Sequence, residues 1–228
     1  MNNLQKMGGI AALIEAAAYL VGIIFFIFVV DYSGVVDPVQ KVALLVDNQA
    51  ILYIMILIIY VIFGVSLVVL ALALYQRLKA GSPAMMQTAT VFGLIWAGVV
   101  IASGMIFNIG LGVVVDLYGT DPAQAATVWL AISSVFEGLG GGVEILGGLW
   151  LLLLSWAALR AGGLPKTLNY LGVVIGVAGV LSAVPALGEI GGLVFGLGQI
   201  VWFLWVGVVL VRSSLSVAVQ KSKAIAAH

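Results

Sequence analysis

The sequence predicts an all-α membrane protein, a polytopic bundle of transmembrane helices. Three observations predict this class. Hydrophobic residues make up 64% of the 228-residue chain and charged residues only 8%, whereas a soluble domain is roughly half apolar and a quarter charged. The mean hydropathy is +1.27. Apolar runs of about 20 residues, the length at which a helix crosses a bilayer, recur along the chain.

Six apolar runs are long enough to be spans, and we expect them to form one transmembrane domain over residues 1–228. The first run is too long for a signal peptide and no small-residue cleavage pattern follows it, so we expect an uncleaved helix. Residues 212–228 would form a tail after the last span. The predicted spans are about 8–30, 50–74, 85–114, 128–158, 168–189 and 191–211.

The basic residues predict how the spans are oriented. Eight of the nine Lys and Arg residues lie at the N-terminus, in the loops after spans two and four, or in the C-terminal tail. Only Lys41 lies on the other side. Because Lys and Arg favour the cytoplasmic side of a membrane, we expect both termini in the cytoplasm and the protein in the cytoplasmic (inner) membrane.

Two predicted outer loops share the pattern D-P-x-Q, at residues 37–40 and 121–124. In each loop the aspartate can cap a helix that begins at the proline. The first of these helices, D-P-V-Q-K-V-A-L-L-V, is predicted to be short and to lie at the membrane surface. The shared pattern is also what a duplication of the first two spans would leave, and that alternative stays open.

Span four contains two glutamates within an apolar, glycine-rich stretch, V-F-E-G-L-G-G-G-V-E-I-L-G-G-L-W, at residues 135–150. On a continuous helix the glycines would let a neighbouring backbone approach closely, and both glutamates would point into that contact. The residues expected on this one face are Glu137, Gly140, Gly141, Glu144, Gly147, Gly148 and Leu151.

Four further polar residues lie within or at the end of predicted spans: Glu15, Asn108, Glu189 and Gln199. Counting along each span places no Lys, Arg or His at the depth of the carboxyls. An isolated carboxylate in hydrocarbon is very costly, so each carboxyl is expected to be neutral, to bind a cation or to contact water. The alternative is a structural role, since neutral Glu, Gln and Asn side chains also hold membrane helices together.

The composition excludes several classes of site. The chain has no cysteine, and its one histidine is the terminal His228, which excludes disulfides, a thiolate nucleophile and a histidine-based metal site in the membrane. No general base accompanies Ser133 and Ser134, and no Walker lysine follows the glycines. We therefore predict no catalytic residue, no metal, no cofactor and no enzyme activity. The net charge of zero gives no indication of a nucleic-acid partner.

Two segments of the sequence resemble a known protein family. The segment G-G-L-W-L-L-L-L-S-W-A-A-L-R-A-G-G-L-P-K-T-L-N-Y-L-G, which begins at residue 147, and the opening helix at 8–22 resemble a family of small bacterial membrane proteins known only as a domain of unknown function. The likeness extends over residues 4–212. It implies about six helices and a membrane location, and it implies no activity. The paired glutamates of span four are a departure from that family.

Two functional hypotheses of different classes follow. The first is a small proton- or cation-linked transporter, or a ligand-binding membrane protein, that uses Glu137 and Glu144. The alternative is a structural or accessory subunit that packs against a larger membrane complex through glycine-rich faces. The expected partners are the lipid bilayer and either further copies of this chain or a partner membrane subunit.

Overall fold

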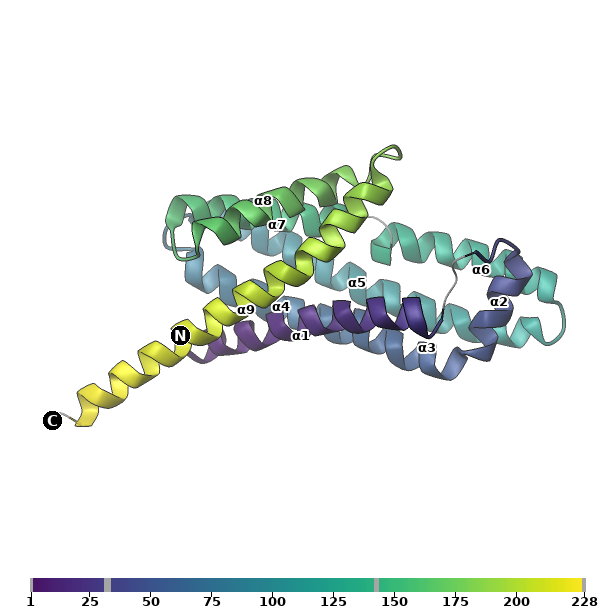
Figure 1. Ribbon diagram of the computed structural model, residues 1–228, viewed down its shortest axis with the longest axis horizontal. Coiled ribbons are helices and arrows are strands. Elements are labelled where there is room, and N and C mark those ends of the chain that lie inside the picture. The colour runs from purple at the N-terminus through teal and green to yellow at the C-terminus, as the bar shows by residue number, and fades with distance from the viewer. Residues whose placement is uncertain (1, 31–33, 142–143, 227–228) are drawn as a thin grey trace. The chain divides into compact units, whose positions relative to one another are not determined.

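The structure is a computed structural model that describes residues 2–30, 34–141 and 144–226, and its regular elements within those ranges are helices (Figure 1). In chain order they are α1 (Asn2–Phe28), α2 (Pro38–Asp47), α3 (Gln49–Ile56), the π-helical η1 (Leu57–Ile62), α4 (Phe63–Leu78), α5 (Pro83–Tyr118), α6 (Pro122–Phe136), the π-helical η2 (Glu137–Gly141), α7 (Ile145–Ala161), α8 (Lys166–Leu181) and α9 (Gly188–Ala226).

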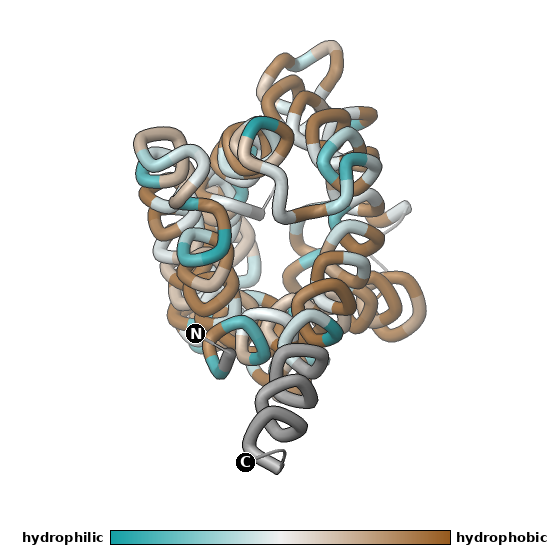
Figure 2. Tube along the Cα trace, turned by 90° about the vertical axis from the view of Figure 1, so that its left-hand side faces the viewer, coloured by the Kyte–Doolittle hydropathy of each residue, from teal (hydrophilic) through white to brown (hydrophobic). Residues whose placement is uncertain are grey.

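The chain is a multi-pass membrane protein. Colouring by hydropathy shows apolar residues predominating along the helices (Figure 2). Helix α8 contains only residues 168–181 of the predicted fifth span, 168–189, and with 16 residues it is shorter than the roughly 20 that a span needs. Within the described residues, five helical stretches are long and apolar enough to cross a membrane, and each overlaps one of the other predicted spans: Asn3–Phe28, Gln49–Leu78, Pro83–Tyr118, Pro122–Ala161 and Gly188–Ser214.

The fourth of these stretches is not one regular α-helix, contrary to the prediction. Within it, η2 forms wide π-type turns, and the backbone at Gly140 is not helical (φ 163°, ψ 13°). The prediction that the glutamates and glycines between 137 and 151 share one helical face is therefore wrong. Glycine occupies three of the four positions 138–141. Each glycine costs about 1 kcal/mol relative to alanine inside a helix, so this segment has little to hold it in a regular helix.

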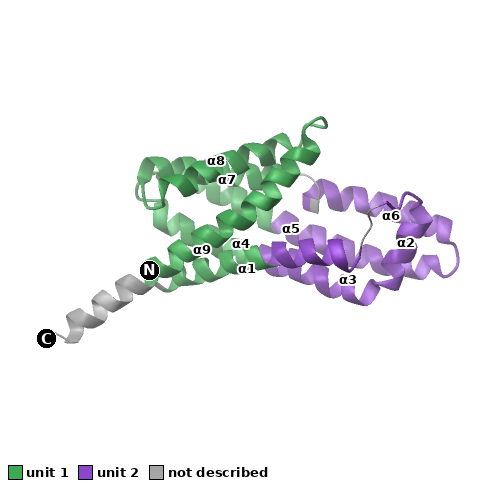
Figure 3. Cartoon of the chain, viewed as in Figure 1, with its two compact units in different colours: residues 1–17, 65–97, 144–228 green, residues 18–64, 98–143 purple. Residues whose placement is uncertain are grey.

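The chain divides into two compact units (Figure 3). Unit 1 comprises Met1–Ala17, Val65–Ala97 and Glu144–His228, and unit 2 comprises Ala18–Gly64 and Gly98–Val143. Helices α1, α4 and α5 each contribute residues to both units. The two predicted carboxyls of span four are assigned to different units, Glu137 to unit 2 and Glu144 to unit 1.

In unit 1, α8 packs antiparallel against both α7 and α9. Glycines set how closely α7 and α8 approach: a Cβ atom added to Gly148 would lie 2.7 Å from the carbonyl oxygen of Gly176 and 2.7 Å from the amide nitrogen of Val180. Because both of those atoms belong to the backbone, only glycine fits this position.

One end of unit 1 is held together by Arg77, near the end of α4. Its guanidinium donates to the carbonyl oxygen of Gly163 at 2.7 Å, to Gln5 Oε1 at 3.4 Å and to Ser213 Oγ at 3.3 Å. These partners belong to the turn between α7 and α8, the start of α1 and the later part of α9. The first turns of α1 and residue 213 of α9 therefore lie at the same end of this unit.

Unit 2 contains the two helices that the D-P-x-Q loops predict, and both caps are confirmed. The carboxylate of Asp37 accepts the amide of Gln40 at 2.8 Å at the start of α2. The carboxylate of Asp121 accepts the amides of Ala123 and Gln124 at 3.1 and 2.9 Å at the start of α6. The two capped helices pack against each other. Their shared core contains Val42, Val114, Ala125 and Ala126.

Candidate functional site

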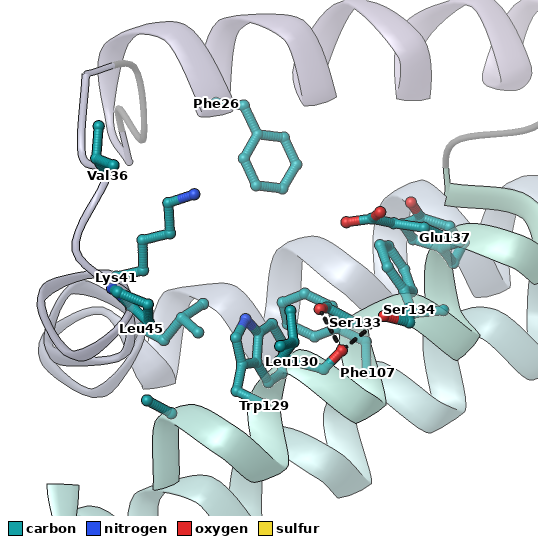
Figure 4. Close-up of a pocket in the computed structure, with 14 residues that line it drawn as sticks. Phe26, Val36, Lys41, Leu45, Phe107, Trp129, Leu130, Ser133, Ser134 and Glu137 are labelled. Atoms are coloured by element: carbon teal, nitrogen blue, oxygen red, sulfur yellow. Dashed lines mark hydrogen bonds between the residues drawn. The ribbon is translucent and has the colours of Figure 1, made fainter. Parts of the chain in front are cut away.

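Unit 2 contains a cavity of about 530 Å³ between α2 and α6 (Figure 4). This volume lies within the roughly 300–1,000 Å³ of typical small-molecule sites. Most of its lining is apolar or aromatic, and a few polar groups converge on it. The lining residues are Phe26, Val36, Pro38, Lys41, Leu45, Tyr60, Phe107, Ala126, Trp129, Leu130, Ser133, Ser134, Phe136 and Glu137.

Four aromatic rings form a connected wall of this pocket. The ring of Tyr60 lies 5.2 Å from that of Phe136, and the ring of Phe107 lies 5.2 Å from Phe136 and 5.1 Å from Trp129. The Phe107 contacts are edge-to-face, the arrangement that aromatic quadrupoles favour. Because the rings fix one another and Phe107 is buried in the core of the unit, the wall is formed before any ligand arrives.

Two opposite charges face the pocket from different elements. Lys41 extends from α2 on one side, and Glu137 lies at the start of η2 on the other, with Phe26 between them in the view of Figure 4. Both side chains are exposed, and neither takes part in an ion pair within the described ranges. The two groups are therefore free to bind charges of a ligand.

Ser133 and Ser134 lie on the Glu137 side of the pocket. Their positions precede Glu137 by four and three residues, a spacing that puts side chains on one helix face. Both hydroxyls donate to the same carbonyl oxygen, that of Leu130, at 3.1 and 2.8 Å. Their protons are thus used within α6, and their oxygens remain available as acceptors.

Glu144 is not among the residues that line this pocket. Glu144 immediately precedes α7, and its backbone amide donates to Ser182 Oγ at 3.0 Å. That hydroxyl in turn donates to the carbonyl oxygen of Gly179 at 2.7 Å. The main chain at Glu144 therefore joins the start of α7 to the end of α8, and the residue does not line the cavity that holds Glu137.

The other four polar candidates also lie outside the pocket. Glu15 and Gln199 are fully buried in unit 1, and none of their side-chain oxygen or nitrogen atoms has a hydrogen-bond partner in the described part of the chain. Asn108 of unit 2 donates from Nδ2 to the carbonyl oxygen of Tyr53 at 3.3 Å, which joins α5 to α3. Glu189 is exposed in the first turn of α9.

The glycines of the predicted face have different surroundings. A Cβ atom on Gly147 would lie 2.6 Å from the ring of Phe195 and 2.7 Å from that of Trp96, and Gly148 is equally confined against α8. Gly140 would make only an ordinary contact at 3.6 Å, with Val100, and both it and Gly141 belong to η2. Close packing therefore involves the glycines of α7.

Sequence reasoning missed Lys41 as a site residue. Counting along each span placed no basic residue near the glutamates, but α2 is a separate short helix whose lysine reaches the same cavity as Glu137. The signal was present, since Lys41 is the one basic residue on the predicted outer side. The described ranges hold no group of three or more His, Cys, Asp or Glu residues able to bind a metal ion.

Comparison with known proteins gives the family and no activity. The model of the family described as Domain of unknown function (DUF4386) matches residues 14–213. The chain belongs to this family. The match confirms the resemblance to a family known only as a domain of unknown function. No curated protein and no solved structure matches the chain.

Proposed function

We propose that this member of the DUF4386 family is a membrane protein that binds a small amphiphilic molecule in the pocket of unit 2. The observation that carries the proposal is the cavity itself: a volume of about 530 Å³ with a connected aromatic wall and two opposite charges that form no ion pair with the described residues. Apolar walls with a few convergent polar groups are typical of small-molecule sites. The proposed role is binding or transport without a catalytic step.

Of the two glutamates that the sequence singles out, Glu137 is the one that we place at the binding site. Its carboxylate can hold an ammonium group or a metal cation, so a cation-linked step would act through this residue. The packing of Gly147 and Gly148 within unit 1 supports no particular partner protein. Ligand binding is therefore the better supported of the two hypotheses.

We further propose six spans, both termini in the cytoplasm, and a pocket that opens on the opposite side of the cytoplasmic membrane. Two observations support this topology. Eight of the nine basic residues lie on one side of the predicted spans. In unit 1, Gln5 near the N-terminus and Ser213 of α9 both bond to Arg77, which is what an even number of passes requires.

Native mass spectrometry of the protein, released gently from its host's membranes, tests the binding proposal. We expect a bound small molecule whose occupancy falls several-fold in Leu130→Trp, which places an indole in the pocket. Leu193→Trp makes the same change on the exposed surface of α9 and should leave the occupancy unchanged. Equal occupancy in both variants, or a partner chain at a fixed ratio and no small molecule, would contradict the proposal and favour an accessory subunit.

A further inference from the structure

The two sides of the pocket differ in hydrogen-bonding chemistry. On the Glu137 side three side chains offer acceptors: the carboxylate of Glu137 and the hydroxyl oxygens of Ser133 and Ser134, whose protons are both given to the carbonyl oxygen of Leu130. A ligand group bound there must supply donors. A positively charged donor would satisfy the carboxylate and the two hydroxyl oxygens together.

The Lys41 side offers the opposite chemistry. The Nζ atom of Lys41 carries three donors and no acceptor, and it extends into the pocket from α2 (Figure 4). The neighbouring lining residues on α2, Pro38 and Leu45, have no polar side-chain atom. A ligand group bound on this side must therefore supply acceptors, and an anion matches the charge of the ammonium.

Between the two charged groups the lining is aromatic. The rings of Tyr60, Phe107, Trp129 and Phe136 give an apolar surface for the body of a ligand. A ligand with one charge that fills the cavity would displace water from the other protein charge and leave it unpaired, which is costly. A ligand with both charges pairs Lys41 and Glu137 at once.

We propose that the ligand is a zwitterion with an apolar body, whose ammonium group binds Glu137, Ser133 and Ser134 and whose anionic group binds Lys41. This inference rests on the proposed function and specifies its ligand class. The same chemistry is available from two sources. One is a membrane phospholipid with an ethanolamine headgroup, and the other is a free aromatic amino acid.

The test compares matched probes on the purified full chain by native mass spectrometry titration. In the first arm the probes are phenylalanine, phenethylamine, which lacks the carboxylate, and 3-phenylpropionate, which lacks the ammonium. In the second arm they are phosphatidylethanolamine and phosphatidylglycerol with identical acyl chains. In at least one arm we expect the zwitterion to bind about tenfold or more tightly than its singly charged analogues, since each analogue loses a charge-assisted hydrogen bond. The arm with the preference identifies the source.

Two variants assign the ends of the ligand. Lys41→Gln should remove the advantage of the zwitterion over the amine probe, and Glu137→Gln should remove its advantage over the anionic probe. Lys166→Gln and Asp116→Asn make comparable changes at exposed residues outside the pocket and should change neither ratio. In the lipid arm, Glu137→Gln should abolish the preference for the ethanolamine headgroup.

The outcomes separate this inference from the proposed function. Tighter binding of the amine alone or of the anion alone, or equal losses for every probe in both variants, would overturn the zwitterion assignment and leave a ligand-binding pocket. Failure of every probe, together with the absence of any natural ligand sensitive to Leu130→Trp, would overturn both. Preference for a zwitterion that persists unchanged in Lys41→Gln and Glu137→Gln would also overturn the assignment, because the charges would then be bound elsewhere.

Discussion

The glutamates Glu15 of unit 1 and Glu137 of unit 2 have opposite surroundings. Unit 1 buries Glu15 and Gln199 completely and gives their side-chain atoms no hydrogen-bond partner within the described ranges. Unit 2 instead exposes Glu137 and Lys41 to a cavity. Two carboxyls that both lie in apolar runs of the sequence therefore differ in solvent exposure. We therefore base the proposed binding site on accessible charges beside an aromatic wall and not on burial.

The units also differ in how their helices approach one another. In unit 1, backbone meets backbone at Gly148 and Gly176, and the rings of Trp96, Trp150 and Trp202 pack beside them at successive centroid distances of 5.7 Å. Unit 2 has an open volume between α2 and α6, and this volume is the proposed binding site.

The largest effect is expected from filling the contact between α7 and α8. Gly148→Leu puts a side chain where backbone atoms lie 2.7 Å from the Cβ position, so the two helices must separate, at a cost of about 3 kcal/mol in the free energy of unfolding. Thermal unfolding in detergent measures the loss. Gly98→Ala is the comparison in unit 2: a Cβ there meets nothing within 4 Å, so this variant should be neutral or stabilise by up to about 1 kcal/mol. Equal melting temperatures for both variants would contradict the difference in packing between Gly148 in unit 1 and Gly98 in unit 2.

A smaller loss is expected at the end of unit 1 that Arg77 holds together. Arg77→Gln removes three charge-assisted hydrogen bonds, to Gly163, Gln5 and Ser213. Since the side chain is partly exposed, solvent screening reduces their contribution, and we expect a loss of about 1–2 kcal/mol. Urea-dependent unfolding checks this value. Arg212→Gln, at an exposed arginine of α9, is the control, and a loss as large there would show that net charge rather than these bonds is responsible.

In unit 2, removal of a helix cap should cost about 1 kcal/mol. Asp121→Ala removes the acceptor of two backbone amides at the start of α6. Asp37→Ala removes the acceptor of one backbone amide at the start of α2. We therefore expect Asp121→Ala to lower the melting temperature more. Asn at either position restores the cap and should restore the temperature. Because α2 and α6 border the pocket, both alanine variants should also weaken ligand binding. A loss of stability with unchanged ligand binding would show that the caps do not influence the pocket.

Local sequence patterns predicted the helices well, and they predicted the site only in part. The two D-P-x-Q loops specify caps by chemistry within four residues, so both helices could be placed from the sequence. The contact between α7 and α8 depends on which glycines meet, and the site depends on how α2 brings Lys41 to the same cavity as Glu137. Counting residues along straight spans predicts neither the contact between these glycines nor the position of Lys41. The glycines after Glu137 also interrupt the helix that the face prediction assumed.

The smallest change in the free energy of unfolding is expected for Glu15→Gln. This variant tests whether the buried carboxyl of Glu15 has a structural role in unit 1. Its carboxyl is fully buried without a hydrogen-bond partner in the described ranges, so we expect it to be neutral. A neutral Glu and Gln are nearly equal in size, and Glu15→Gln should change the free energy of unfolding by less than about 1 kcal/mol. Infrared spectroscopy should show the carbonyl band of a protonated carboxylic acid that disappears in Glu15→Gln and persists in Glu137→Gln. Stabilisation by several kcal/mol would instead mean that Glu15→Gln removes a buried charge, and unit 1 would then hold a second site that binds a proton or a cation.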